Sequence, residues 1–334
     1  MILPNYLEET TCYSGVRDRK TMTLENKSEK ESYHESVLLD EAVQFIAPDP
    51  GKLIVDGTLG GGGHSEAFLK AGAHVIGLDQ DPEALAFAMQ RLGDGSGRFR
   101  AVHANFAELD AVLDRLGIAQ IDGAFLDLGV SSRQIDKAER GFSFMREGPL
   151  DMRMNSLAVT TAADLVNNAS GEQLEEIFRN FGEEPQARRI AAKITEERMS
   201  RPFETTLDLA RVVERVVPRH GKTHPATRVF QALRMAVNRE LESLGMALEQ
   251  FGRRLAPGGR FGVITFHSLE DRMVKTFFKT HSAEWIDRPE WPEARPNPVR
   301  IFRLVKNKPV VASDGEQQRN PRSRSAKFRI VEKI

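Results

Sequence analysis

The chain has 334 residues, of which 40% are hydrophobic and 28% charged, a composition typical of a globular enzyme large enough for more than one domain. Its formal net charge of −1 gives no overall attraction to nucleic acid, so any phosphate-binding surface must come from local clusters of basic residues. The single cysteine, Cys12, excludes an intramolecular disulfide and a multi-cysteine zinc site. The sequence has neither a signal-peptide core nor a run of about 20 apolar residues that would cross a bilayer. We therefore expect a cytoplasmic protein with no membrane partner.

Residues 1–33 show almost no hydrophobic periodicity and combine five basic with six acidic side chains. We expect them to form a disordered N-terminal extension, because so polar a segment cannot bury enough apolar surface to become ordered. Order should begin near Ser36-Val37-Leu38-Leu39, a short apolar stretch that leads into a helix.

From residue 53 the chain alternates strand and helix patterns. Short apolar runs predict four strands, at residues 53–56, 74–79, 99–103 and 124–127. A glycine-rich turn and a helix follow the first strand, and Pro82 suits the first turn of the next helix. Such alternation predicts a parallel sheet with right-handed crossovers.

Residues 137–228 interrupt the alternation, because they hold helical patterns and no convincing strand. A long helix then ends before Pro257, and a strong strand pattern over residues 261–266 resumes the sheet. Residues 299–305 and 326–331 have the pattern of two final strands.

The predicted fold is therefore α/β, with a doubly wound, mostly parallel, Rossmann-like sheet and an inserted helical domain. A helical block between two strands of one sheet is an insertion and not a sequential domain. We assign residues 34–136 and 229–334 to the sheet domain and residues 137–228 to the insertion.

The first strand is joined to the first helix by the sequence DGTLGGGGHS, residues 56–65. Consecutive glycines let the backbone approach a ligand closely and adopt positive φ angles, although a flexible surface loop has the same composition. The dinucleotide pattern G-x-G-x-x-G is incomplete, because Ser65 stands where a third glycine is required, and the Gly-Lys-Ser/Thr of a P-loop is absent. What remains is an aspartate, Asp56, four residues before the pair Gly60-x-Gly62. This pattern is similar to the first motif of adenosylmethionine-dependent methyltransferases.

Acidic and aromatic residues follow the next strands. Asp79 stands 19 residues after Gly60, where a carboxylate accepts hydrogen bonds from both hydroxyls of a ribose, in NAD and adenosylmethionine enzymes alike. An ordinary acid at a helix start is the alternative. Phe106, after the third strand, is placed to lie against adenine, or else to be a core aromatic. Asp127 ends the fourth strand, where doubly wound sheets bind ligands.

Longer motifs resemble the bacterial 16S ribosomal RNA cytosine-N4 methyltransferase family, also called the MraW type. The resemblance covers roughly residues 33–332. It is carried by HESVLL (34–39) with the 56–65 loop, DLGVSS (127–132) with RGFSFM (140–145), PLDMRM (149–154), HPATR (224–228), FHSLEDR (266–272) and NPR (320–322). Motifs this long and in this order are far more specific than a glycine loop.

The resemblance implies a methyltransferase whose cofactor is S-adenosylmethionine. The cofactor contacts that it implies are Gly62, Gly63, His64, Asp79, Phe106, Asp127 and Gln134. The acceptor that it implies is the exocyclic N4 of a cytosine in the decoding region of 16S ribosomal RNA, cytosine 1402. The small ribosomal subunit is the expected partner, and the sequence leaves open whether the enzyme is a homodimer.

The catalytic residue is less evident, because the Ser/Asp/Asn-Pro-Pro-aromatic motif of DNA amino-methyltransferases is absent after the fourth strand. The candidates are Asp127, Ser132 and Asn238. Gln231, Arg234 and Asn238 share one face of the predicted long helix, which is alternatively a solvated polar face. His267 and Ser268 follow the strand at residues 261–266, so they either line the cleft or, as at Ser268, cap a helix.

Two stretches are candidates for RNA-phosphate contact, although solubilising charge is the usual explanation for such stretches. Residues 319–333 carry six basic side chains against one acid, and residues 201–234 carry seven against three. A nicotinamide-dependent dehydrogenase, a non-catalytic ribosome-assembly factor, and a methyltransferase acting on protein or small molecules remain alternatives. The missing third glycine and the helical insertion weigh against the dehydrogenase.

Overall fold

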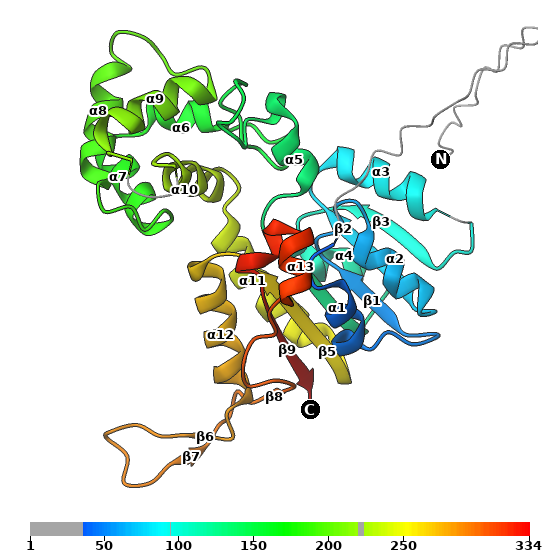
Figure 1. Ribbon diagram of the computed structural model, residues 1–334. Coiled ribbons are helices and arrows are strands. Elements are labelled where there is room, and N and C mark those ends of the chain that lie inside the picture. The colour runs from blue at the N-terminus through cyan, green and yellow to red at the C-terminus, as the bar shows by residue number, and fades with distance from the viewer. Residues whose placement is uncertain (1–35, 94, 220–223) are drawn as a thin grey trace, which may run out of the picture. The chain divides into compact units, whose positions relative to one another are not determined.

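The computed structural model describes residues 36–93, 95–219 and 224–334. The predicted extension over residues 1–33, with Cys12, lies outside the described residues. Figure 1 shows the elements, which follow one another as α1 (Leu39–Ile46), β1 (Leu53–Asp56), α2 (Gly63–Lys70), β2 (His74–Asp79), α3 (Pro82–Leu92), β3 (Phe99–His103), η1 (Phe106–Glu108), α4 (Leu109–Arg115), β4 (Ile121–Asp127), α5 (Ser132–Asp136), η2 (Ala138–Arg140), α6 (Ala162–Asn168), α7 (Gly171–Asn180), α8 (Ala187–Glu197), α9 (Thr206–Val216), α10 (Thr227–Val237), α11 (Glu240–Arg254), β5 (Leu255–Thr265), α12 (Ser268–Ser282), β6 (Trp285–Ile286), β7 (Arg295–Pro296), β8 (Phe302–Leu304), α13 (Asp314–Arg319), η3 (Pro321–Ser325) and β9 (Lys327–Lys333).

Seven strands form one sheet in the order β3-β2-β1-β4-β5-β9-β8. Strands β1 to β5 are parallel, whereas β9 runs antiparallel to both β5 and β8. The strand order reverses at β1, which has β2 on one side and β4 on the other, and doubly wound sheets bind ligands outside the carboxyl ends of the strands at such a point. The predicted α/β, mostly parallel fold is confirmed.

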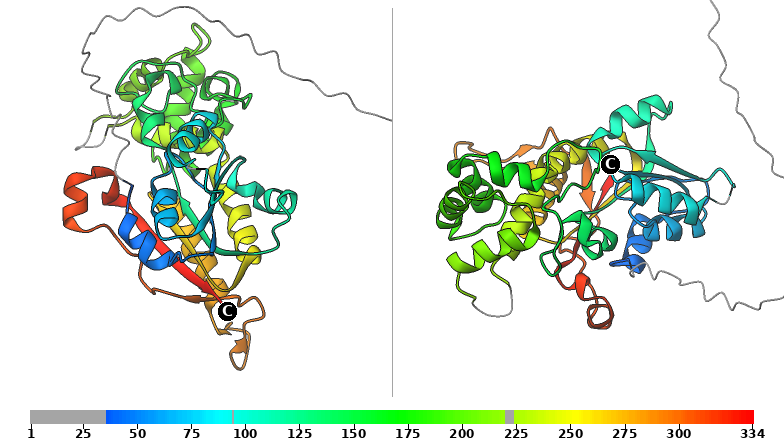
Figure 2. Two further views of the ribbon diagram at one scale, coloured as in Figure 1. Left: turned by 90° about the vertical axis from the view of Figure 1, so that its right-hand side faces the viewer. Right: turned by 90° about the horizontal axis from the view of Figure 1, so that it is seen from above.

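Helices cover both faces of the sheet, as Figures 1 and 2 show. Helices α1, α2 and α3 lie over one face, where the ring of Phe68 packs 5.6 Å from that of Phe125. Helices α4, α11 and α12 lie over the other face, where Phe251 stacks 5.1 Å from Phe261. The parallel strands read as apolar runs in the sequence because both of their faces are buried.

The segment between β4 and β5 is helical and has an apolar core of its own. This core is formed by residues of α6 to α10 and of the loop before α6, among them Leu150, Met152, Val166, Leu174, Phe178, Ile190, Ile194, Leu209, Val213, Val229, Phe230 and Leu233. The predicted boundary between residues 228 and 229 falls inside α10, which runs from Thr227 to Val237. Val229 and Phe230, on the far side of that boundary, belong to the core of the helical segment.

The predicted long helix before Pro257 is two helices, α10 and α11, which meet at Asn238 and Arg239. Arg239 adopts a left-handed conformation with φ 49°, which ends the first helix and redirects the second. The sequence concealed this break because apolar residues recur at helical spacing through both helices. Pro257 itself lies within β5, which starts two residues earlier than the proline, at Leu255.

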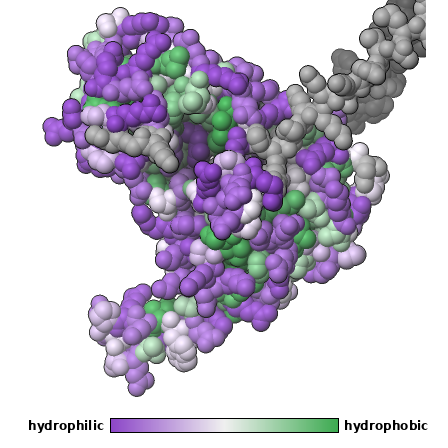
Figure 3. Space-filling model, in the orientation of Figure 1, coloured by the Kyte–Doolittle hydropathy of each residue, from purple (hydrophilic) through white to green (hydrophobic). Residues whose placement is uncertain are grey.

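The C-terminal strands differ in detail from the expectation. The strand predicted over residues 299–305 is only Phe302–Leu304, and the short hairpin β6–β7 that precedes it was not predicted. The last strand, β9, matches the predicted 326–331 with a short extension. Across the described ranges, no helix is long and apolar enough to span a membrane, and Figure 3 shows a mainly hydrophilic face with smaller hydrophobic areas.

Candidate active site

A cavity of about 390 Å³ lies at the carboxyl edge of the parallel strands. Its wall is formed by the glycine loop, the ends of β2 and β4, the start of α5, the junction of α10 and α11, the residues before α12, and η3. This volume is in the range of small-molecule sites, and the position is where the fold class binds ligands.

The glycine loop wraps the end of β1. The buried carboxylate of Asp56 accepts hydrogen bonds from the hydroxyl of Ser65 at 2.7 Å and from the amide of residue 58 at 3.1 Å, and these bonds close the loop onto α2. Gly63 lines the cavity, whereas Gly62 does not. At Gly62, with φ +76°, a Cβ would lie 2.7 Å from the side chain of Leu92, so Gly62 allows the loop to pack onto α3.

Asp79 lines the cavity at the end of β2. Its Oδ2 accepts the amide of Gly60 at 2.7 Å and its Oδ1 accepts the amide of Asp81 at 2.8 Å. An ionised carboxylate has about four acceptor positions, so two remain for a ligand. Burial raises the pKa of Asp79 to about 6, and the negative charges of Asp81 and Asp56 add to the rise. The two hydrogen bonds lower this pKa but do not cancel the effect of burial.

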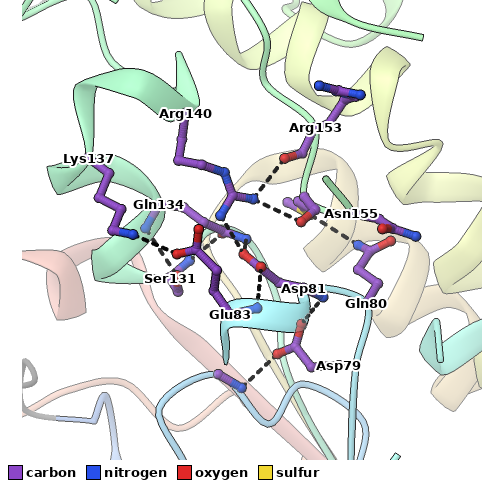
Figure 4. A network of polar contacts seen from close by, with 12 residues as sticks. Asp79, Gln80, Asp81, Glu83, Ser131, Gln134, Lys137, Arg140, Arg153 and Asn155 are labelled. Atoms are coloured by element: carbon purple, nitrogen blue, oxygen red, sulfur yellow. Dashed lines mark hydrogen bonds and ion pairs between the residues drawn. The ribbon is translucent and has the colours of Figure 1, made fainter. Parts of the chain in front are cut away.

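Asp81 connects this wall to the segment that follows β4 (Figure 4). Its side chain caps α3 by accepting the amide of Glu83. It also accepts the side-chain amide of Gln134 at 3.0 Å and the guanidinium of Arg140 at 2.8 Å. Arg140 in turn donates to the carbonyls of residues 153 and 154. The predicted contact residue Gln134 is buried in the cavity wall by this network.

Phe106 also lines the cavity, beside Asp79 and Gln80. It begins η1, which Asn105 caps, and it packs against the main core while staying half-buried. Phe106 therefore contacts the core and also lines the cavity, and its contact with adenine stays a prediction.

Asp127 and His64 are neighbours in the cavity wall. His64 is buried, its Nε2 lies 3.0 Å from the carbonyl of Val37, and its Nδ1 lies 3.9 Å from Oδ2 of Asp127. Burial lowers the pKa of His64 to about 4, although the hydrogen bond to Val37 has the opposite effect. The ring is therefore neutral and forms no ion pair with Asp127.

The carboxyl of Asp127 has an unusual environment. Its Oδ1 is buried and has no hydrogen-bond partner in the described part of the chain. Burial raises the pKa of Asp127 well above its ordinary value, and the negative charges of Asp56 and Glu270 raise it further. A buried acceptor without a partner indicates a ligand that supplies the donor.

Asn238 is a predicted catalytic candidate, and its amide is mostly engaged within the protein. Its Nδ2 donates to the carbonyls of Met152 and Arg234, both at 2.8 Å, and its Oδ1 accepts the amide of Met154 at 2.7 Å. The predicted shared face with Gln231 and Arg234 is not a solvated surface. Arg234 and Asn238 line the cavity, whereas Gln231 lies outside it and contacts Met235.

Two acidic residues on the cavity wall, Glu240 and Glu270, were not singled out in the sequence, whereas His267 was expected to line the cleft and does so. Glu240 pairs with both edges of the Arg234 guanidinium, at 2.7 and 2.8 Å. His267 Nε2 lies 2.9 Å from Glu270, and His267, not Ser268, is the cap of α12. Despite burial, the hydrogen bond from His267, the charge of His267 and that of Arg234 hold the pKa of Glu270 below its ordinary value.

Glu240, His267 and Glu270 also place ligand atoms within 4.8 Å of one another, as a metal site would. However, the Arg234 guanidinium already supplies a positive charge to this cluster, because it forms two hydrogen bonds with Glu240. We therefore assign no metal to the cluster.

Ser132, the third catalytic candidate, begins α5 and lines the cavity. Its hydroxyl accepts a hydrogen bond from the guanidinium of Arg322, which η3 carries into the same cavity. In the sequence, Arg322 belongs to the NPR motif of the family resemblance and to the basic stretch over residues 319–333, and neither predicted that it lines the cavity. Other cations of that stretch are engaged elsewhere, since Lys327 and Arg329 both pair with Asp271.

The MraW methylase family matches residues 31–334 of this sequence. The chain belongs to that family. Three relatives from Geobacter sulfurreducens, Magnetococcus marinus and Rhizobium leguminosarum bv. trifolii are each named Ribosomal RNA small subunit methyltransferase H. They are 48%, 47% and 50% identical over 90%, 90% and 89% of this chain, and the matches cover 99%, 98% and 86% of their own lengths.

Solved structures with a similar arrangement include an rRNA methylase from Streptococcus thermophilus and the N-methyltransferase NodS from Bradyrhizobium japonicum. The first is 14% identical with a TM-score of 0.37, over 89% of this chain and 93% of its own. The second is 6% identical with a TM-score of 0.40, over 88% and 93%. Both likenesses are distant.

As a member of the MraW methylase family, the chain is a methyltransferase, and its cofactor is S-adenosylmethionine. The residues of the cavity suit this molecule, which carries a sulfonium and an ammonium group. Four carboxyl groups line the wall, those of Asp79, Asp127, Glu240 and Glu270, and the Oδ1 of Asp127 has no partner among the described residues.

Proposed function

We propose that this MraW-family enzyme methylates the exocyclic N4 of a cytosine in the decoding region of 16S ribosomal RNA, cytosine 1402, on the small ribosomal subunit. Membership of the family and relatives named Ribosomal RNA small subunit methyltransferase H support the class of substrate. The observation that carries the choice of an amino group is the buried Oδ1 of Asp127, an acceptor without a donor.

In this proposal the cofactor lies across the carboxyl ends of β1, β2 and β4. Asp79 accepts the ribose hydroxyls through its two remaining acceptor positions, and the half-buried ring of Phe106 lies against adenine. The loop at Gly63 and His64 borders the methionine end, with Gly62 shaping the loop from behind. Gln134 closes the wall through its bond to Asp81.

S-adenosylmethionine supplies a methyl carbon that the sulfonium has already activated. The cytosine amine is a poor nucleophile, because its lone pair is delocalised into the ring. Asp127 Oδ1 accepts an N–H of this amine, which favours the tetrahedral nitrogen, and the carboxylate then holds the proton that the amine releases. A raised pKa suits this role, because a more basic carboxylate is a better proton acceptor near neutral pH.

The absence of a thiol supports nitrogen over carbon as the acceptor atom. Methylation of cytosine at C5 proceeds through covalent addition of a cysteine thiol. The chain has one cysteine, Cys12, and residues 36–334, which contain every residue of the cavity wall, have none.

The test is to incubate small ribosomal subunits and protein-free 16S RNA separately with enzyme and methyl-labelled cofactor, and to digest the RNA to nucleosides. We expect N4-methylcytidine from the subunits and unchanged activity in Cys12→Ser. Label in 5-methylcytidine or in another base would contradict the proposed chemistry. Equal labelling of free RNA would contradict only the assembled substrate, and no labelling at all would favour a non-catalytic assembly factor.

A further inference from the structure

The charges around the cavity are unbalanced. Four carboxyl groups line it, whereas its arginines are only Arg234 and Arg322. Arg234 is engaged with Glu240 through two hydrogen bonds. Arg322 forms no ion pair with any carboxylate of the described ranges, and its guanidinium bonds to the neutral hydroxyl of Ser132.

Arg322 is half-buried, so its charge is partly removed from water without a compensating anion. Burial lowers its pKa, and the more distant charge of Asp136 opposes that effect. A guanidinium stays charged in proteins, so the loss of hydration is a cost that only an anionic partner offsets well. Within the described residues no such partner is present, which points to an anionic group on a ligand.

The cofactor carries such a group. Its methionine end has an ammonium, for which the cavity offers several carboxylates, and a carboxylate, which the same acids would repel. Arg322 is the arginine of the wall that is not already paired with an acid. Five serines also line the cavity, and the hydroxyl of one of them, Ser36, lies 2.0 Å from where a Cβ on Gly63 would be.

We propose that Arg322 binds the carboxylate of the methionine end of S-adenosylmethionine, with Ser132 orienting its guanidinium. This inference rests on the proposed placement of the cofactor by Asp79 and Phe106. A guanidinium matches a carboxylate through two parallel N–H···O bonds, which a lysine cannot reproduce. Ser132 is then a positioning residue and not a catalytic one.

The experiment compares two ligands that differ only in the carboxylate, S-adenosylhomocysteine and its decarboxylated analogue, by calorimetry. Hydrogen bonds between charged groups are strong enough for wild-type enzyme to prefer S-adenosylhomocysteine by about tenfold or more. Arg322→Ala should lower this preference to about onefold by weakening only S-adenosylhomocysteine. Arg322→Lys should keep part of the preference, because it keeps the charge and loses the paired geometry.

Arg324→Ala is the matched control, because Arg324 is exposed on the same short helix and does not line the cavity. It should keep the full preference. Equal weakening of both ligands in Arg322→Ala would overturn the proposal, since it would indicate general damage to the cavity. Unchanged affinity for S-adenosylhomocysteine with a raised KM for RNA would also overturn it, in favour of an RNA phosphate as the partner.

A separate arm tests the placement on which this rests. Asp79→Ala should weaken both ligands to a similar degree, because both carry the ribose. If neither ligand responds to Asp79→Ala, the proposed cofactor placement fails whatever Arg322 does. If both respond but the preference is insensitive to Arg322→Ala, only the assignment of the carboxylate fails.

Discussion

At the scale of single residues, the strongest constraint on the site is that its carboxyl groups are buried beside one another. Asp56, Asp79 and Asp127 all have raised pKa values, with burial as the largest cause in each case. A ligand with two positive groups relieves this accumulation of charge. We therefore expect the ionisation of Asp79 to control cofactor binding and that of Asp127 to control methyl transfer.

Cofactor affinity should depend on pH through Asp79. Its pKa of about 6 means that the carboxylate is ionised above pH 6 and becomes protonated as the pH falls below that value. A protonated carboxyl is a weaker acceptor for the ribose hydroxyls. We expect the affinity for S-adenosylhomocysteine, measured by calorimetry from about pH 8 to about pH 5, to fall by up to about tenfold per pH unit below pH 6.

Asp79→Asn separates this effect from that of Asp56, whose pKa burial also raises to about 6. The side chain at position 79 is then neutral at every pH. The weaker binding of S-adenosylhomocysteine by this variant should therefore be nearly independent of pH over this range. A wild-type profile that persists in Asp79→Asn would show that Asp56 or another group is responsible.

Asp127→Asn should affect the chemical step. The amide keeps the size of the carboxyl but cannot take up a proton, and general-base contributions are typically a factor of about 10² to 10⁴. We expect kcat to fall at least about 100-fold while the affinity for S-adenosylhomocysteine changes only a few-fold. A single-turnover rate close to that of the wild type would remove Asp127 from the chemistry.

Several site residues were predictable because they follow strands. Asp79 and Asp127 end strand patterns and Phe106 follows one, and parallel strands bring their carboxyl ends to one edge of the sheet. Glu270 and Arg322 were not predictable in this way, because they reach the cavity from elements whose positions depend on tertiary packing. Both lie in motifs of the family resemblance, FHSLEDR and NPR, but those motifs did not assign either residue to a ligand.

At the scale of elements, the junction of α10 and α11 shows where periodicity is insufficient. Apolar residues continue at helical spacing through Asn238, so the sequence predicted one helix. The break depends on two hydrogen bonds to distant backbone, in which Asn238 donates to the carbonyl of Met152 and accepts the amide of Met154. No local pattern encodes these contacts.

Asn238→Ala should therefore act mainly on stability. The substitution removes three hydrogen bonds of a half-buried amide and leaves a backbone N–H without its acceptor. We expect the free energy of unfolding in urea to fall by about 1–3 kcal/mol. Gln231→Ala, on the same helix but outside the cavity, should change it by less than about 0.5 kcal/mol. A stable Asn238→Ala with strongly reduced kcat would instead support the catalytic role that the sequence suggested.

We propose that the helical block is a domain that helps to hold RNA and is not needed to complete the sheet. Its own apolar core supports this division. The amide of Met154 lies 2.7 Å from the side-chain oxygen of Asn238, so the two residues that flank residues 155–237 are close together. A short linker can therefore replace residues 155–237. The shortened protein should fold, bind S-adenosylhomocysteine and fail to methylate ribosomal RNA.

Circular dichroism, calorimetry and the RNA assay check the three parts of this expectation. An unfolded product would mean that the sheet depends on the block. Full methylation activity would mean that the block does not contribute to holding RNA.

At the scale of the whole molecule, alternation of strands and helices was sufficient to predict the class of fold, and the first five strands are parallel as expected. The final strands were harder, because the hairpin β6–β7 and the reversed direction of β9 depend on long connections with little periodicity. The edge of the sheet that holds the cavity was therefore predictable, and the C-terminal side chains that complete it were not.

The most direct measurement of the central proposal is to map methylated nucleotides in small-subunit ribosomal RNA from cells that lack this protein. Cells complemented with wild-type protein should regain an N4-methyl group on one cytosine of the decoding region, and cells complemented with Asp127→Asn should not. An unchanged pattern of methylation without the protein, or restoration at a different base, would contradict the account.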